Sequence, residues 1–393
     1  MGFLSGRVNF LRFRVAGRAP KMFGPDHLER LADHVIGKER IVSADGIEAG
    51  WIAGDHILDT RFDLAKNIVN DTLQFALRLD TQKIPADLLR AYTQVELEGV
   101  AAKNPGGMPS ARQKRDAREA ARARLDKEAG DGRFLRRKAY PILWDCLTNE
   151  LLVGTTAAAA LDRLHTLFQK TFGHGFEIIG AGRRAFLLAE LREQTRGVDD
   201  AGPARFVPGG ASGEIAWIPD EASRDFLGNE FLLWLWYILD KESDTIVLGD
   251  GSEVAVMLAR SLVLECPRGQ TGKESISSEA PARLPEARRA IQSGKLPRKV
   301  GLTLVRHDRQ YELTLSAETL AISSARLPAP ESEEERARQE ERVTVLRDLV
   351  ETLDLLYDVF CRMRTSGGWP RELAKIKRWL QINERERVLS ADS

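Results

Sequence analysis

The sequence has few cysteines, no long apolar run and no net charge. Its three cysteines are far apart and odd in number, so they give neither a disulfide framework nor a metal-binding Cys-x-x-Cys pair, and they fit a reducing compartment. The segment Phe226–Leu239 comes nearest to a membrane span, but it contains Glu230 and is shorter than the roughly 18 residues required. No apolar core of a secretion signal follows Met1. We therefore expect a cytoplasmic protein without a membrane partner.

The charges are evenly balanced, with 58 Lys and Arg residues against 58 Asp and Glu residues. This balance excludes a chain that is basic throughout, as many small nucleic-acid binders are. It still allows one basic surface offset by acidic segments elsewhere. With 43% apolar and 30% charged residues, the composition predicts a folded globular protein rather than a disordered one. The length of 393 residues is enough for two or three domains of about 100–200 residues each.

Motifs of catalysis and cofactor binding are weak. The run 180–185 has two of the three glycines of a dinucleotide-binding fingerprint, and we interpret it as a loop. The run 269–274 has the wrong glycine spacing for a phosphate loop, and Glu274 replaces the Ser or Thr that would hold magnesium. The six histidines form no pair at metal-ligand spacing with a third donor. The sequence therefore predicts a protein with no catalytic residues, no metal and no cofactor.

The apolar patterning indicates an α+β fold. Alternation of apolar and polar residues predicts strands over 8–15 and 73–79 and a mostly β region over 244–325. Helical spacing predicts helices after Pro25, after Pro85, over 161–172 and over the last 63 residues. We interpret Gly50-Trp51 as a loop and 197–213 as a loop or linker. This order favours antiparallel sheets with flanking helices over a doubly wound sheet.

We divide the chain into five segments by composition and pattern. They are an N-terminal α+β region 1–105, a basic helix and turn 106–140, a central strand–helix region with a loop 141–225, a β-rich region 226–330 and a C-terminal helical region 331–393.

The basic stretch from residue 111 to residue 140 is the most informative feature. Four of its arginines are spaced three, three and four apart, so on a helix they point in roughly one direction: Arg112, Arg115, Arg118 and Arg122. A row of guanidinium groups matches a phosphate backbone, and its binding releases counterions without reading sequence. Three further cations could extend this surface: Arg136, Arg137 and Lys138. Such contacts position DNA rather than specify a sequence.

The same stretch also fits a simpler interpretation as a solvated helix. Four basic–acidic pairs are spaced i,i+4: Arg112 with Asp116, Arg115 with Glu119, Arg122 with Asp126, and Arg124 with Glu128. Each pair stabilises a helix by only tenths of a kcal/mol, and the basic-to-acidic order is the poorer orientation. Composition alone leaves both interpretations open.

Two apolar patterns bear on alternative functions. The run 231–237 could stack bases, but seven consecutive apolar residues are more typical of a core. From Val343 to Phe360 apolar residues repeat at spacings of three and four, a seam of about three heptads. This seam predicts either a coiled-coil contact or a helix packed on its own domain. A protein–protein interaction module built on this helix is the first alternative to DNA binding, and an unrecognised nuclease is the second.

The order of the pieces resembles the bacterial recombination-associated protein RdgC family. The opening strand and Gly50-Trp51 come first, and the run 77–90 is similar to the family's strand, lysine, proline and helix. The other similar runs follow in the family's order: the charged helix, Leu143-Trp144-Asp145, residues 149–153, the helix ending at Phe172-Gly173, and residues 290–295 leading into the strands of 300–327.

The resemblance implies a ring-shaped homodimer without catalytic activity, whose positively charged hole admits double-stranded DNA. It also implies binding without marked sequence preference, antagonism of RecA-promoted strand exchange by occupation of the duplex, and therefore association with the nucleoid. Carried over by position, Lys83, Arg90 and the basic helix, including Lys114, would face the DNA. Phe134 falls near the family aromatic of the ring-closing dimer gate, where 132–137 replaces the family's Leu-Pro-basic-Ala-aromatic run.

Overall fold

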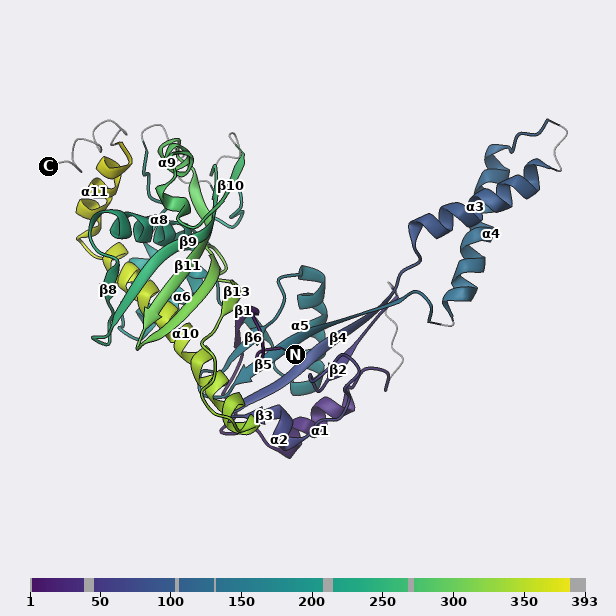
Figure 1. Ribbon diagram of the computed structural model, residues 1–393, viewed down its shortest axis with the longest axis horizontal. Helices are drawn as coiled ribbons and strands as arrows, with labels where there is room; N and C mark the ends of the chain where they lie inside the picture. The colour runs from purple at the N-terminus through teal and green to yellow at the C-terminus, as the bar shows by residue number, and fades with distance from the viewer. Residues whose placement is uncertain are drawn as a thin grey trace.

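The computed structural model describes residues 2–38, 46–102, 106–130, 132–207, 215–267 and 272–381. Three parts are visible: a helix-covered sheet formed by the C-terminal half, a central unit of strands and helices, and an arm of two helices that projects from the central unit (Figure 1).

The strands, in chain order, are β1 (Val8–Val15), β2 (Ile47–Ile52), β3 (Ile68–Val69), β4 (Thr72–Gln82), β5 (Leu135–Asp145), β6 (Glu150–Val153), β7 (Phe176–Ile178), β8 (Thr245–Val247), β9 (Glu253–Glu265), β10 (Lys273–Ser278), β11 (Leu296–Arg306), β12 (Arg309–Ser316) and β13 (Ile322–Arg326).

The α-helices are α1 (Pro25–Asp33), α2 (Leu64–Asn67), α3 (Ala86–Ala101), α4 (Ala111–Ala129), α5 (Ala158–Phe172), α6 (Ala181–Glu190), α7 (Arg196–Asp199), α8 (Phe226–Lys241), α9 (Pro285–Gln292), α10 (Glu335–Arg364) and α11 (Trp369–Gln381).

One antiparallel sheet runs through both halves of the molecule. Its main order is β10-β9-β11-β12-β13-β1-β6-β5-β4-β2. β1 is the connecting strand, because Val8 and Phe10 pair with β13 while residues 11–14 pair with β6. Helix α10 runs from the central unit to the C-terminal half, beside this sheet (Figure 1). The predicted α+β class, with an antiparallel sheet and flanking helices, is confirmed.

Most predicted elements are present, and three interpretations were wrong. Gly50-Trp51 lies in β2 rather than in a loop, because residues 47–52 pair with β4. A Cβ on Gly50 would lie 2.4 Å from the Cα atom of Ile36, so only glycine allows this close approach.

The run 180–185 begins α6 rather than forming a loop. The N–H groups of Ala181 and Gly182 donate to Glu318 and Asp225, which leaves them no role at a phosphate. The third difference concerns 136–138, which lie in β5 rather than in a turn.

The apolar seam of α10 packs inside the chain. Val343 is buried, and Leu346, Leu353, Tyr357 and Phe360 are buried in the same core cluster as the aromatic run of α8. Phe360, for example, lies 5.7 Å from Phe231 of α8 between ring centroids. The aromatic run is therefore core, as predicted. The seam is a helix packed on its own chain and is not free for an intermolecular coiled coil.

A glycine-to-alanine change tests the packing of α8. A Cβ on Gly228 would lie 1.9 Å from the carbonyl oxygen of Ala317, in the connection between β12 and β13. We expect Gly228→Ala to lower the free energy of unfolding by about 1–3 kcal/mol, because overpacking displaces backbone. Urea unfolding followed by circular dichroism measures this change.

Gly99→Ala is the matched control. Gly99 lies within α3, and no neighbouring side chain of the described residues comes within 4 Å of the position that a Cβ would take there. Alanine at this position should stabilise the helix by up to about 1 kcal/mol. If the free energy of unfolding changes in the same direction in both variants, the close contact between α8 and Ala317 is contradicted.

Candidate nucleic-acid interface

A two-stranded ribbon supports the projecting arm. β4 and β5 pair continuously from Thr72 opposite Asp145 to Gln82 opposite Leu135. One further hydrogen bond, from the Lys83 N–H to the Phe134 carbonyl oxygen at 3.1 Å, extends the ladder to its end. Beyond this point α3 and α4 form an antiparallel hairpin that stands clear of the rest of the chain (Figure 1). The arm therefore comprises residues 83–138 and brings together Lys83, Arg90 and the whole basic stretch.

Small side chains hold the two helices of the arm together. The buried residues of α4 recur every four positions: Ala117, Ala121, Leu125 and Ala129. Residues four apart share one face of a helix, so this narrow stripe packs against α3. At the side of the stripe, the Tyr92 hydroxyl donates to Glu128 at 3.0 Å and the Arg124 guanidinium lies 4.5 Å above the Tyr92 ring. The remaining circumference of α4 faces solvent.

All ten cations predicted to contact DNA are exposed and lie on this arm. They are Lys83, Arg90, Arg112, Lys114, Arg115, Arg118, Arg122, Arg136, Arg137 and Lys138. Because a helix advances by about 100° per residue, the four arginines of the predicted row lie within about a third of the α4 circumference. Glu119 and Asp126 lie on the same side, so the row is not uniformly positive. Arg133, between hairpin and ribbon, is also exposed and was not among the predicted residues.

Most of these cations have no carboxylate partner. Arg90 pairs with Asp87, Arg112 lies 3.9 Å from Asp116, and Arg137 lies 3.6 Å from Asp80. The other seven form no ion pair with any residue that the structure describes: Lys83, Lys114, Arg115, Arg118, Arg122, Arg136 and Lys138.

The i,i+4 pairs therefore explain only part of the charge on α4. Of the four possible pairs, Arg112–Asp116 and Arg124–Glu128 form, at 3.9 and 3.7 Å. Arg115 and Arg122 form no ion pair within the described ranges, although an acidic residue follows each at the right spacing. Because such long, exposed pairs contribute little, the guanidinium groups of α4 remain available to another anion.

Arg137 differs from its two neighbours in β5. Successive side chains of a strand point to opposite faces, so Arg136 and Lys138 share one face and Arg137 lies on the other. There Arg137 approaches Asp80, which is already held by the buried Arg78 through an Nε–Oδ1 hydrogen bond of 2.7 Å. Arg136 and Lys138 are thus the better candidates for phosphate contacts.

The arm concentrates positive charge in a neutral chain. Residues 83–138 contain fourteen Lys and Arg against eight Asp and Glu, whereas the totals for the whole chain are equal. The excess on the arm is therefore balanced by acidic residues elsewhere. Exposed charges farther apart than a Debye length of about 8–10 Å are largely screened from one another. A ligand that approaches the projecting arm consequently encounters a local positive field.

The chain offers little support for other kinds of site. No group of three or more His, Cys, Asp or Glu side chains in the described ranges is placed to hold a metal ion. Among the helices of those ranges, none combines the length and the apolar character that a bilayer span requires. No family model matches the sequence, and no curated protein is significantly similar to it.

Truncation of Leu125 tests whether the arm is a separate folding unit. Leu125 is fully buried between α3 and α4, and Leu-to-Ala changes in cores cost about 2–5 kcal/mol. Since the hairpin stands clear of the other helices that the structure describes (Figure 1), we expect Leu125→Ala to speed amide hydrogen exchange at least tenfold throughout α3 and α4, with α5 unchanged. Hydrogen-exchange mass spectrometry resolves these segments.

Leu164→Ala provides the comparison. Leu164 is equally buried, but in α5 of the central unit. This change should loosen α5 and leave exchange in the hairpin as it was. If Leu125→Ala instead destabilises α5 as strongly as α4, the arm and the central unit form one cooperative unit.

Proposed function

We propose that this protein is a non-catalytic, largely sequence-independent double-stranded DNA-binding protein. The observation that supports this most is a group of seven exposed cations on one isolated arm that form no ion pair with the residues that the structure describes. Each of them can neutralise a phosphate, and every neutralised phosphate releases condensed counterions. Backbone contacts of this kind hold a duplex without reading its bases.

The form of the arm suits a ligand that is long and uniform. Its cations are distributed along α4 and along the β5 end of the ribbon rather than gathered in a pocket. Arginine guanidinium groups bind phosphate oxygens in a bidentate manner, which strengthens each contact. A duplex offers about one negative charge per 1.7 Å of axis, so several of these side chains can be engaged at once.

The resemblance to the RdgC family extends the proposal from one chain to an assembly. In the extended proposal, two copies of the chain form a ring-shaped homodimer, and their arms enclose the duplex. Occupation of duplex DNA by such a ring would restrain RecA-dependent homologous recombination and would place the protein on the nucleoid. The order of the similar segments supports this part of the proposal. The alternative function, a protein–protein interaction module built on the apolar seam of α10, has less support, because that seam is buried in its own chain.

Duplex binding measured across a salt series tests the proposal. We expect log affinity to fall linearly with log salt concentration, by about 0.9 per phosphate contacted. Replacement of Arg115, Arg118 and Arg122 by Ala should reduce this slope by about two to three, because up to three phosphate contacts are lost. Fluorescence anisotropy with a labelled duplex of mixed sequence gives both quantities.

A variant with the same change of charge serves as the control. Arg326, Arg371 and Arg378 are exposed and form no ion pair within the described chain, but they lie outside the arm. Their replacement by Ala should leave the slope within about one unit of the wild-type value. If both triple variants reduce the salt slope equally, the net charge of the chain determines binding, and the position of the charges on the arm does not.

The proposed dimer gate has its own test. Phe134 is half-buried at the root of the arm, where its carbonyl oxygen accepts the Lys83 N–H. If its ring closes a homodimer around DNA, Phe134→Ala should speed dissociation from a closed circular duplex at least tenfold, because a buried aromatic anchor contributes about 2 kcal/mol or more. Competitor-chase measurements on circular and linear DNA give the rates.

Phe134→Leu separates loss of the contact from loss of the fold. Leucine keeps an apolar side chain at the root of the arm and should largely preserve slow release from the circle. From a short linear duplex the wild-type protein and both variants should dissociate at similar rates, because a ring can slide off an end. Identical rates on circular DNA for the wild type and Phe134→Ala would remove Phe134 from the gate.

A further inference from the structure

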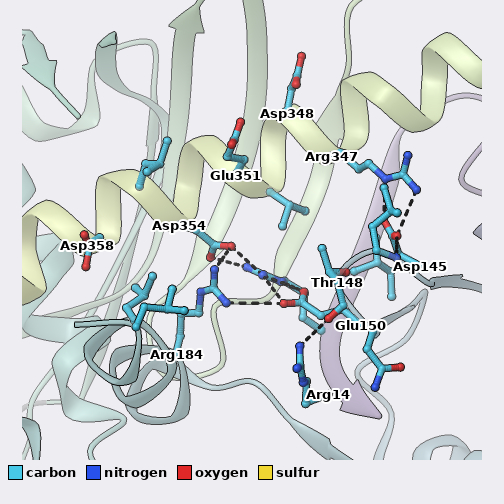
Figure 2. A pocket seen from close by; sticks show the side chains of 18 of the residues that line it. Arg14, Asp145, Thr148, Glu150, Arg184, Arg347, Asp348, Glu351, Asp354 and Asp358 are labelled. Atoms are coloured by element: carbon cyan, nitrogen blue, oxygen red, sulfur yellow. Dashed lines mark hydrogen bonds and ion pairs between the residues drawn. The ribbon is translucent and has the colours of Figure 1, made fainter. Parts of the chain in front are cut away.

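A cleft of about 1160 Å³ lies between α10, the C-terminal end of α6 and strands β1, β5 and β6. Its lining residues come from the body of the molecule, and none of them belongs to the arm. Figure 2 shows its charged side chains, which come from α10 on one side and from the sheet and α6 on the other. The proposed DNA-binding function uses none of these residues.

A buried ion network forms the base of the cleft. The Arg12 guanidinium donates to both Glu150 and Asp354, with N–O distances of 2.8 and 2.7 Å. Arg184 of α6 pairs with the same two carboxylates, so the four groups are mutually neutralised (Figure 2). No net charge is left over at this depth.

Around this network the carboxylates lie deeper than the arginines that neutralise them. The Asp145 side chain is 7% exposed, whereas its partner Arg347 is 23% exposed. The Asp358 side chain is 6% exposed, whereas its partners Arg192 and Arg362 are 18% and 54% exposed. The charge that a ligand would meet in this part of the cleft is therefore that of the guanidinium groups.

Two further arginines of the lining pair with no carboxylate of the described residues. Arg14 donates to the carbonyl oxygen of Thr148 at 2.5 Å, and Arg18 is exposed at the rim. Neither forms an ion pair with a described residue. Two acids of the lining, the half-buried Asp348 and the exposed Glu351, point away from the Arg14 side of the cleft (Figure 2). They pair with Arg309 and Arg306, away from the Arg14 side chain.

Apolar side chains accompany the cations. Leu143, Leu152 and Leu346 form a buried part of the wall. At the mouth, Leu147 and Leu191 are 66% and 84% exposed, although both belong to the lining. These two leucines give a ligand in the cleft apolar groups to contact.

We propose that this cleft binds an acidic peptide segment of a partner protein, with apolar side chains against the leucines and carboxylates on Arg14 and Arg18. The cleft exceeds the roughly 300–1,000 Å³ of most small-ligand pockets, and a small ligand inside it would leave the leucines at the mouth uncovered. A DNA backbone offers phosphates but no apolar groups for those leucines. Charge complementarity and exposed leucines together favour the peptide.

Peptide binding to the full-length protein tests the proposal. The probe is a short fluorescent peptide in which Leu alternates with Glu, and the comparison peptide carries Lys in place of Glu. We expect the Glu peptide to bind at least tenfold more tightly, because like charges are disfavoured in the cleft. Arg14→Ala combined with Arg18→Ala should weaken its binding by about tenfold, and Arg18→Ala alone by about threefold, since charge-assisted hydrogen bonds are lost.

Controls distinguish this site from the DNA-binding surface. Arg326→Ala combined with Arg371→Ala removes the same charge outside the cleft and should leave peptide affinity unchanged. The Arg14 and Arg18 variant should bind duplex DNA as the wild type does, whereas the triple α4 variant should bind the peptide normally. Because Arg18 is exposed and forms no ion pair within the described chain, its single variant reports on the cleft even if the double variant is destabilised.

Three results would overturn the proposal: no binding of the Glu peptide, equal affinity for the two peptides, or displacement of the bound peptide by duplex DNA. The last result would assign the cleft to nucleic acid. Failure of the peptide test with an intact salt dependence of DNA binding would leave the function of the arm untouched.

Discussion

One buried arginine connects parts of the chain that are far apart in sequence. Arg12 lies in β1, and its guanidinium donates to Glu150 of β6 and to Asp354 of α10. Burial alone lowers the pKa of this group, but the charges of Asp354 and Glu150 outweigh burial and raise the pKa above its usual value. A buried charge without its partners would cost several kcal/mol. The network therefore fixes α10 against β1, and with it the central unit against the C-terminal half.

The ribbon of β4 and β5 imposes a second constraint. Its ladder continues past the apolar core to Gln82 and Leu135, so the hairpin is held at a distance from the acidic body. Within the hairpin, the alanine stripe of α4 occupies little of the helix surface, and long cationic side chains can occupy the rest. A wide apolar face would have left fewer positions for them. The composition of α4, rich in Ala and Arg, is thus the one that such an arm requires.

Local patterns predicted the elements well, but not the contacts between distant residues. The strand over 8–15 was evident from alternation, yet both of its faces are buried, including that of Arg12. Nothing near Arg12 in sequence indicates partners 138 and 342 residues away. Residues 136–138 were interpreted as part of a basic turn, but pairing with β4 places them in a strand. Most cations of the arm, in contrast, were found from composition, because surplus charge without an apolar stripe marks an exposed helix. Lys83 and Arg90 were added only by the family resemblance.

The chain forms positive surface in two physically different ways. On the arm, carboxylates are few and most cations form no ion pair with a described residue, so the field extends into solvent and is sensitive to salt. In the cleft, Arg347, Arg192 and Arg362 lie above the deeper carboxylates with which they pair, so their charge acts over contact distances and beside leucines. The first arrangement suits a polyanion that must be attracted without regard to sequence. The cleft suits a ligand whose shape and apolar groups must also match. Solvent-exposed charge alone does not distinguish between ligands of different shape.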